Sequence, residues 1–186
     1  MKIRNKHAFT LVETLIVLSI LSILSVVLVQ IFISSLRGGS KAQIVGIVKQ
    51  NGQAALETMD KAIRSADEVI CPQANTTLDT LVIQKSVTFI RFKFNLPTAS
   101  PPVNGFISQD NVGDCTSPLG ANYTSLTNLN ITNGASVSGG SFTRNSKTGF
   151  NDLITIFFNI SPAVSAPQIL TSTIDPIRFN TTVQLR

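Results

Sequence analysis

The sequence predicts an α+β fold, in which a long N-terminal helix leads into a β-rich C-terminal domain. An uncharged and mostly apolar stretch runs from Thr14 to Leu36, and apolar residues then recur every three or four positions as far as Ile70. From Thr76 onward, short apolar runs and alternating patterns indicate strands. We expect the amphipathic second half of the helix to pack on a C-terminal antiparallel β-sheet, because this arrangement buries the apolar faces of both.

Composition argues against catalysis. The 186 residues include 15 Lys and Arg, 10 Asp and Glu, two Cys and a single histidine, His7. Two cysteines and one histidine are too few for a structural zinc site, and any imidazole base would have to be residue 7. The two commonest glycine-rich phosphate-binding motifs do not occur. We therefore expect no enzyme activity, no catalytic residue, no metal and no cofactor.

The N-terminal region has the pattern of a membrane anchor. Residues 1–8 carry Lys2, Arg4 and Lys6 and no acid. The uncharged residues 14–36 would form a helix about 34 Å long, which can cross a hydrocarbon core of about 30 Å. A buried helix or an ordinary secretory signal fits less well, since the run is too long. The charge distribution predicts a cytoplasmic N-terminus and an extracytoplasmic C-terminal domain, hence a single-pass protein of the inner (cytoplasmic) membrane.

Glu13 is exceptional, because it is an acid at the start of an apolar helix. A charged side chain costs about 2.5 to 3.5 kcal/mol at the centre of a bilayer, and such residues usually have a partner. A second interpretation places Glu13 in the headgroup region, where the positive end of the helix dipole stabilises an acid by about 0.3 to 1 kcal/mol. The residues alone leave both interpretations open.

The segment Lys6-His-Ala8-Phe9-Thr10-Leu11-Val12-Glu13, followed at once by the apolar run, closely resembles the processing site of type IV pilins and pseudopilins. The resemblance implies that a prepilin peptidase cuts between Ala8 and Phe9 and then methylates the new amine of Phe9. Ala8 stands where the family usually has glycine. The resemblance also implies that the Glu13 carboxylate meets the Phe9 amine of a neighbouring subunit during assembly.

The chain then divides into four expected parts: a leader (1–8), a hydrophobic transmembrane or filament-core helix (9–36), an amphipathic extension of the helix (37–70) and an extracytoplasmic β-rich globular domain (71–186). Arg37-Gly-Gly-Ser40 predicts a bend or loosened turn, since each glycine costs about 1 kcal/mol in a helix. Two ion pairs, Glu57 with Lys61 and Asp60 with Arg64, are expected on the solvated face. Cys71-Pro72 should end the helix at Ile70.

The C-terminal domain should contain strands separated by long loops. We predict strands at 80–83, 87–94, 153–160 and 177–186, brief ones near 106–107 and 126–131, and a loop over Gly134 to Ser141. In the strand 87–94, Phe residues alternate with Arg91 and Lys93, which we expect to face water. The same alternation occurs on some nucleic-acid surfaces, but a half-buried strand explains it, so no nucleic-acid contact is expected.

Cys71 and Cys115 favour a disulfide, because the exported part of the chain permits oxidation. The bond would close a loop of about 45 residues and stabilise by roughly 3 to 4 kcal/mol. Two separate buried thiols are the alternative. Asp110 and Asp114 carry oxygens that calcium prefers, but their spacing departs from the EF-hand loop and turn formation explains them equally well.

The resemblance implies a structural role: a minor pilin-like subunit of a type IV pilus-like filament. Its partners would be other pilins or pseudopilins through the N-terminal helix, the prepilin peptidase, and an assembly platform with its motor ATPase. After processing it would leave the membrane for an extracellular or periplasmic filament. A pseudopilin of a type II secretion or competence DNA-uptake system is a first alternative. A signal-anchored surface binding module that never enters a filament is a second.

Overall fold

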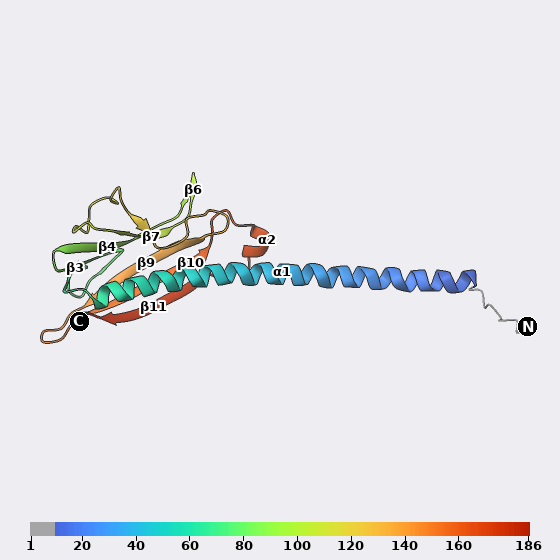
Figure 1. Ribbon diagram of the computed structural model, residues 1–186, viewed down its shortest axis with the longest axis horizontal. Helices are drawn as coiled ribbons and strands as arrows, with labels where there is room; N and C mark the ends of the chain where they lie inside the picture. The colour runs from blue at the N-terminus through green and yellow to red at the C-terminus, as the bar shows by residue number, and fades with distance from the viewer. Residues whose placement is uncertain (1–9) are drawn as a thin grey trace, which may run out of the picture. The chain divides into compact units, whose positions relative to one another are not determined.

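The computed structural model describes residues 10–186 and divides the chain into two units. The first unit ends at Ser40, and the second comprises Lys41–Arg186. Helix α1 (Leu11–Arg64) supplies the first unit and the beginning of the second. Figure 1 shows it coloured from blue to green. Each unit is described by itself below.

The second unit contains the remaining elements in the order β1 (Glu68–Cys71), β2 (Thr77–Leu78), β3 (Thr80–Lys85), β4 (Thr88–Asn95), β5 (Thr98–Ala99), β6 (Pro102–Val103), β7 (Phe106–Asp110), β8 (Thr124–Ser125), β9 (Ala135–Asn145), β10 (Leu153–Pro162), α2 (Gln168–Thr171) and β11 (Ile177–Gln184).

The strands form two principal sheets instead of the one expected. One has the order β1-β3-β4-β7-β8 and the other β11-β10-β9-β2, while β5 and β6 form a small hairpin. All neighbouring strands are antiparallel. The predicted α+β class, with a long N-terminal helix and a C-terminal antiparallel region, is therefore confirmed. The strongest strand signals, in β3, β4, β10 and β11, correspond to real strands.

The helix ends earlier than the sequence predicted. It stops at Arg64 and not at Ile70, and residues 68–71 form β1. The amide of Asp67 already donates to Gln84 O of β3 at 2.8 Å, and Val69 and Cys71 are buried. Pairing with β3 satisfies the backbone and buries Val69, a β-branched residue that favours strands, together with Cys71, so a strand forms here in place of further helix.

The loosened turn expected at Gly38 and Gly39 does not form, since α1 continues through both residues. A Cβ at either glycine would contact nothing within 4 Å, so their cost is one of conformational freedom only. About 1 kcal/mol for each glycine weakens a helix without breaking its hydrogen bonds.

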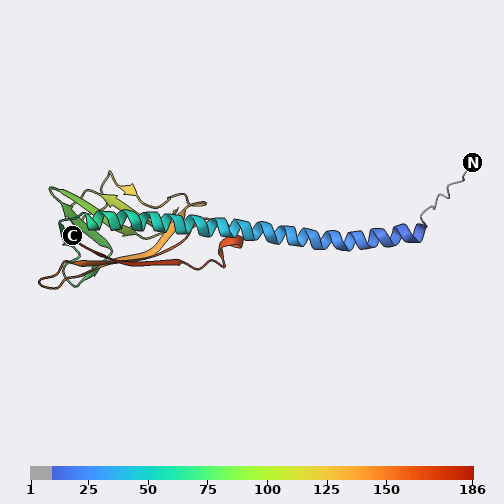
Figure 2. The same ribbon diagram turned by 60° about the horizontal axis from the view of Figure 1, so that its bottom comes forward.

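The part of α1 in the second unit buries one face among the strands, as Figures 1 and 2 show for its cyan and green turns. Val48, Ala55, Met59 and Ile63 belong to the same buried cluster as core residues of both sheets. On the opposite face lie the two predicted ion pairs, with N–O distances of 2.6 Å for Lys61–Glu57 and 2.9 Å for Arg64–Asp60. The amphipathic stripe is thus confirmed between residues 44 and 63.

Gly52 sets how closely the helix approaches β11. A Cβ built on Gly52 would lie 2.3 Å from two ring carbons of Phe179. That ring cannot withdraw freely, because it stacks on the buried Phe158 with ring centroids 5.0 Å apart. A glycine is required here for helix and strand to pack.

Strand β9 is the largest departure from expectation. The Gly- and Ser-rich stretch predicted as a loop lies almost entirely in this strand of 11 residues, whereas 126–131 is not a strand. Small residues are tolerated because β10 pairs along the whole length of β9. At Gly140 the absence of a side chain makes room for the Phe94 ring, whose nearest carbon lies 2.6 Å from an ideal Cβ position.

Two alanine substitutions on one helix test the role of Gly52. Gly52→Ala should lower the free energy of unfolding, because overpacking against Phe179 costs about 1 to 3 kcal/mol and outweighs the gain of about 1 kcal/mol in helix propensity. Gly46→Ala is the control, because a Cβ there meets nothing within 4 Å. It should leave stability unchanged or raise it. Denaturant unfolding of the full chain in detergent micelles measures both, and equal effects would contradict the packing account.

Candidate functional site

The N-terminal apolar segment is the most unusual surface of the chain. Within residues 10–186, α1 is the one helix long and apolar enough to cross a membrane. Its large apolar side chains between Leu11 and Leu36 are exposed by 42 to 80 %. An apolar surface on all sides of a helix is stable only in lipid or among other apolar helices.

Three serine hydroxyl groups in this segment are already satisfied within the helix. Ser19 Oγ donates to Ile16 O at 2.7 Å, Ser22 Oγ to Ser19 O at 2.8 Å, and Ser25 Oγ to Leu21 O at 2.8 Å. An unpaired hydroxyl would cost several kcal/mol in hydrocarbon. These bonds remove that cost, so the serines are compatible with an environment without water.

Glu13 lies in the first turn of α1, and its carboxylate is exposed. Its backbone amide donates to Thr10 Oγ1 at 3.2 Å, so Thr10 caps the helix. Thr10 and Glu13 have the spacing of a capping box, in which an acid at this position also benefits from the helix dipole. Among the described residues Glu13 forms no ion pair.

The segment around Cys115 is the other region that the sequence singled out. We call residues 110–120 the disulfide loop. Cys71 and Cys115 form a disulfide, with Cα atoms 6.3 Å apart, which is the pairing that the sequence favoured. The bond attaches the segment after β7 to the end of β1. Asp110 and Asp114 are at the two ends of the candidate calcium segment, and their oxygens have other partners.

Arg91 was expected to face water, and this expectation is wrong. Its side chain is 1 % exposed and reaches under the loop that follows Asp110. Nε and Nη2 donate to the two Asp110 carboxylate oxygens at 2.8 and 2.6 Å. The remaining N–H groups donate to the carbonyl oxygens of Asp114, Ser117 and Pro118, each at 3.0 Å. Every guanidinium donor is thus used, which is what permits the charge to be buried.

Asp110 and Asp114 are both held in the ionised form. Burial by itself would raise the pKa of Asp110, but hydrogen bonds from Arg91 and the Gly120 amide, together with the Arg91 charge, lower it below 3.8. Hydrogen bonds from Ser117 and Thr116 lower the pKa of Asp114 to about 2. Because both pKa values fall on folding, the carboxylates stabilise the fold above the ordinary pKa and lose this effect as pH falls through the folded values.

The aromatic side chains that alternate with basic ones in β4 are not available for stacking with bases. Phe92 and Phe94 are 0 and 3 % exposed, and Phe94 stacks on Phe142 with ring centroids 4.7 Å apart. The alternation therefore reflects a half-buried strand, with Arg91 buried for a separate reason.

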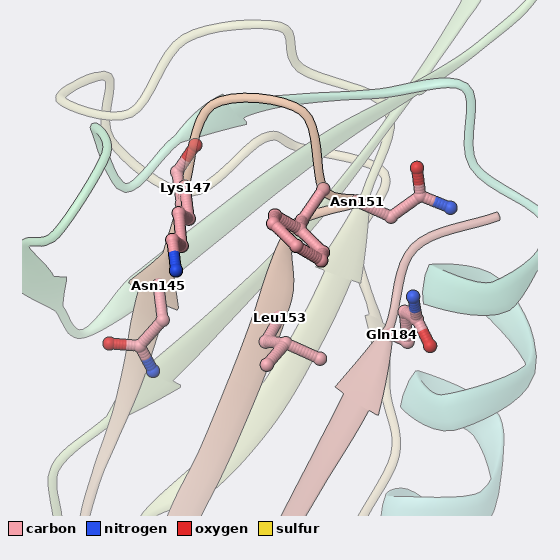
Figure 3. A pocket seen from close by; sticks show the side chains of 7 residues that line it. Asn145, Lys147, Asn151, Leu153 and Gln184 are labelled. Atoms are coloured by element: carbon pink, nitrogen blue, oxygen red, sulfur yellow. The ribbon is translucent and has the colours of Figure 1, made fainter.

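A shallow pocket of about 380 Å³ lies at the β9–β10 hairpin. It is lined by Asn145, Ser146, Lys147, Phe150, Asn151, Leu153 and Gln184. In Figure 3, Asn145 and Gln184 lie on opposite sides of Leu153. Lys147 Nζ is 5.3 Å from the centre of the Phe150 ring, which is 70 % exposed. The sequence analysis missed this pocket, because its residues converge only through hairpin formation and the pairing of β10 with β11.

Comparison with known proteins identifies the N-terminal segment. The prokaryotic N-terminal methylation motif matches residues 3–29. The match includes two of the three basic residues, Arg4 and Lys6, together with the Ala8–Phe9 pair, Glu13 and the first part of the apolar run. The chain carries the type IV pilin-like prepilin signal. No curated protein and no solved structure matches the chain.

The prepilin signal explains why an apolar helix is exposed in this chain. It implies processing by a peptidase and assembly with pilins, and together with α1 it fits single-pass membrane anchoring. Ala8 and Phe9 lie outside the described residues, so cleavage between them and methylation of Phe9 remain predictions. Glu13 belongs to the described residues and lies in the first turn of α1. Its role in assembly remains a prediction.

The Arg91–Asp110 pair should control the order of the disulfide loop. Asp110→Asn leaves a buried guanidinium without its counter-charge, which typically costs about 3 to 5 kcal/mol. Asp114→Asn is the matched control, because Asp114 is exposed, and it should cost much less. Thermal unfolding of the full pilin-like chain in detergent, followed by circular dichroism, compares the two. Equal midpoints would show that the pair does not support the fold.

Proposed function

We propose that this chain is a structural subunit of a type IV pilus-like filament and acts as a minor pilin. The observation that carries the proposal is the exposed apolar helix with a lone acid, Glu13, in its first turn. This acid lies inside the matched methylation motif. Such a helix can be stored in a membrane and later transferred into a bundle of similar helices without contact with water. The proposed role requires no catalysis, cofactor or metal.

Glu13 would direct this transfer. Cleavage before Phe9 creates a positively charged amine a few residues from the Glu13 carboxylate, and each charge is costly in an apolar environment. Pairing Glu13 of one subunit with the Phe9 amine of a neighbour removes much of the cost from both. Because only one offset between the helices brings the charges together, the pair would also set the register of assembly.

The proposed partners follow from this route. The prepilin peptidase acts on residues 1–8, and an assembly platform with its motor ATPase extracts the processed subunit. Other pilins contact residues 9–36. The N-terminus would be cytoplasmic and the β-rich unit extracytoplasmic, because the three basic residues precede the apolar run. Filament assembly would then carry the chain to an extracellular or periplasmic location.

Two alternatives remain candidates. A pseudopilin of a type II secretion or competence DNA-uptake system would use the same signal and helix, and the neighbouring genes would distinguish these systems. A signal-anchored binding module is favoured by a different observation, the pocket beside the exposed Phe150 ring. Such a module would stay in the membrane with its leader intact.

Glu13→Val tests the assembly role directly. The variant should be cleaved and inserted normally, because it removes a charge from an apolar segment. It should enter filaments far less than the wild type, since the Phe9 amine loses its partner. Immunoblots of sheared filament and membrane fractions from cells that produce each variant give the distribution. Glu68→Gln, which neutralises an exposed acid in β1, is the control and should assemble normally. Wild-type levels of Glu13→Val in filaments would refute the role.

The mature N-terminus decides between processing and a permanent anchor. Mass spectrometry of the N-terminal peptide should find wild-type protein beginning at a methylated Phe9. Replacement of Ala8 by Trp should block the peptidase by its bulk and leave a full-length chain in the membrane fraction. Ala8→Gly, which restores the residue usual in the family, is the control and should be cut at least as fast as wild type. An intact Met1 in wild-type membranes of a host with an active peptidase would favour the binding module.

A further inference from the structure

Several apolar side chains of the second unit remain exposed beside the first half of its helix. We call Val103, Leu129, Ile131, Val164 and Ile169 the basal patch. Four of them are 39 to 41 % exposed, and Ile169 in α2 is 76 % exposed. Figure 1 shows α2 beside the helix at one end of the β-rich unit, and β6, which contains Val103, in the same half of the unit. These residues come from three separate loops, so the fold has brought them to this half.

Asn104 holds the loops together. It is completely buried, and its Nδ2 donates to Asn130 O at 2.8 Å while its Oδ1 accepts from the Val164 amide at 2.9 Å. The Ser165 amide also donates to Ile131 O at 2.8 Å. Val164 and Ile131 take part in these bonds, and Val103 and Leu129 are next in sequence to residues that do. The apolar side chains are therefore presented by an ordered framework.

Lys41 ties the last patch member to the helix. Its Nζ donates to Thr173 Oγ1 at 2.7 Å and to Thr173 O at 3.4 Å. Thr173 lies two residues after the end of α2, so these bonds keep α2 beside the first turn of the helix in this unit. Asn51 Oδ1 accepts from the Asn128 amide at 2.8 Å and so holds the loop of Leu129 against the same helix.

The chain itself limits how far this end can move from the apolar segment. Lys41 is only five positions beyond Leu36, the last residue of the apolar run. Even a fully extended chain of that length spans no more than about 18 Å. Whatever the angle between the two units, Lys41 therefore stays near the surface of a membrane that holds residues 14–36.

We propose that the basal patch rests on the lipid surface while the chain is anchored, with Ile169 entering the boundary between headgroups and acyl chains. Single apolar side chains on a mostly polar surface suit shallow insertion, whereas a stable protein interface requires a larger continuous area. Arg37 and Lys41 are the charged residues between Leu36 and Gly46, and both attract anionic headgroups. The inference rests on membrane anchoring and does not require the filament.

Lipid-borne quenching tests this contact. The native cysteines form a disulfide, so Ile169→Cys supplies a single thiol for an environment-sensitive fluorophore. The full chain is reconstituted in vesicles of phosphatidylcholine and phosphatidylglycerol, some of which carry a nitroxide high on the acyl chain. The control is Val87→Cys, which is 89 % exposed in the β3–β4 turn. A bond of 2.7 Å from the Ser86 amide to Asp67 Oδ2 places that turn at the Arg64 end of the helix, about 35 Å along the axis from Lys41.

We expect several-fold stronger quenching at position 169 than at position 87. Equal quenching at the two positions overturns the proposal. Quenching that is absent at 169, together with a blue shift that grows with the ratio of protein to lipid, would also overturn it, because a second copy would then cover the patch. Flotation of the vesicles monitors anchoring separately, and protein that fails to float removes the premise without testing filament assembly.

A second variant examines the Lys41 tether. Lys41→Ala in the labelled Ile169→Cys chain should reduce quenching toward the value at position 87, because α2 loses its attachment to the helix. Lys49→Ala removes the same charge from an exposed position on the same helix and should leave quenching unchanged. Equal effects of the two substitutions would show that Lys41 does not position α2.

Discussion

The structure depends above all on how an apolar helix avoids water. The segment from Leu11 to Leu36 exposes apolar side chains in every direction, and the free energy of burying them dominates any other contact it makes. An apolar environment has to cover this surface. Lipid and neighbouring helices are the environments that can do so, and they are chemically similar enough for one sequence to suit both. This similarity would let membrane anchoring and the proposed helical assembly use the same surface.

Three of the serines in that segment need no hydrogen-bond partner outside the helix. Ser19, Ser22 and Ser25 give their hydrogens to carbonyl groups of their own helix, so none requires an external partner. Glu13 is different, because its backbone amide is satisfied by Thr10 while its carboxylate extends outward. A single unsatisfied charge in otherwise apolar surroundings is a strong constraint on where a partner helix can sit. The chain thus combines a permissive surface with one specific position.

The second unit solves a separate problem, which is to hold long polar loops on a small core. Two residues do much of this by satisfying several backbone groups at once. Arg91 uses all its donors on Asp110 and three carbonyl groups, and Asn104 joins two loops through its amide. The Cys71–Cys115 bond covalently attaches the same loop that Arg91 supports. Such polar centres replace the apolar side chains that these Asn- and Thr-rich segments lack.

Local sequence was sufficient where the signal is periodic or chemical. Residue spacing was enough to predict the apolar run, the helical stripe through Met59, the ion pairs on the opposite face of that helix and the alternating strands. The reason is that side-chain direction repeats with secondary structure. The prepilin signal could be recognised from the sequence because it is a short contiguous segment around Phe9. Cys71 and Cys115 could be paired because the chain has no other cysteine.

Tertiary structure decided whatever depends on a distant partner. The stretch from Ala135 to Asn145 is a strand because β10 pairs with it, although its glycines and serines favour a loop. Val69 and Ile70 lie in a strand and not in the helix because β1 pairs with β3. Arg91 is buried because Asp110 lies opposite it on β7. The basal patch likewise brings together segments far apart in sequence, and the pocket at Phe150 joins one hairpin to Gln184 of β11. Cross-strand pairing and charge compensation are properties of two segments together, so neither segment alone reveals them.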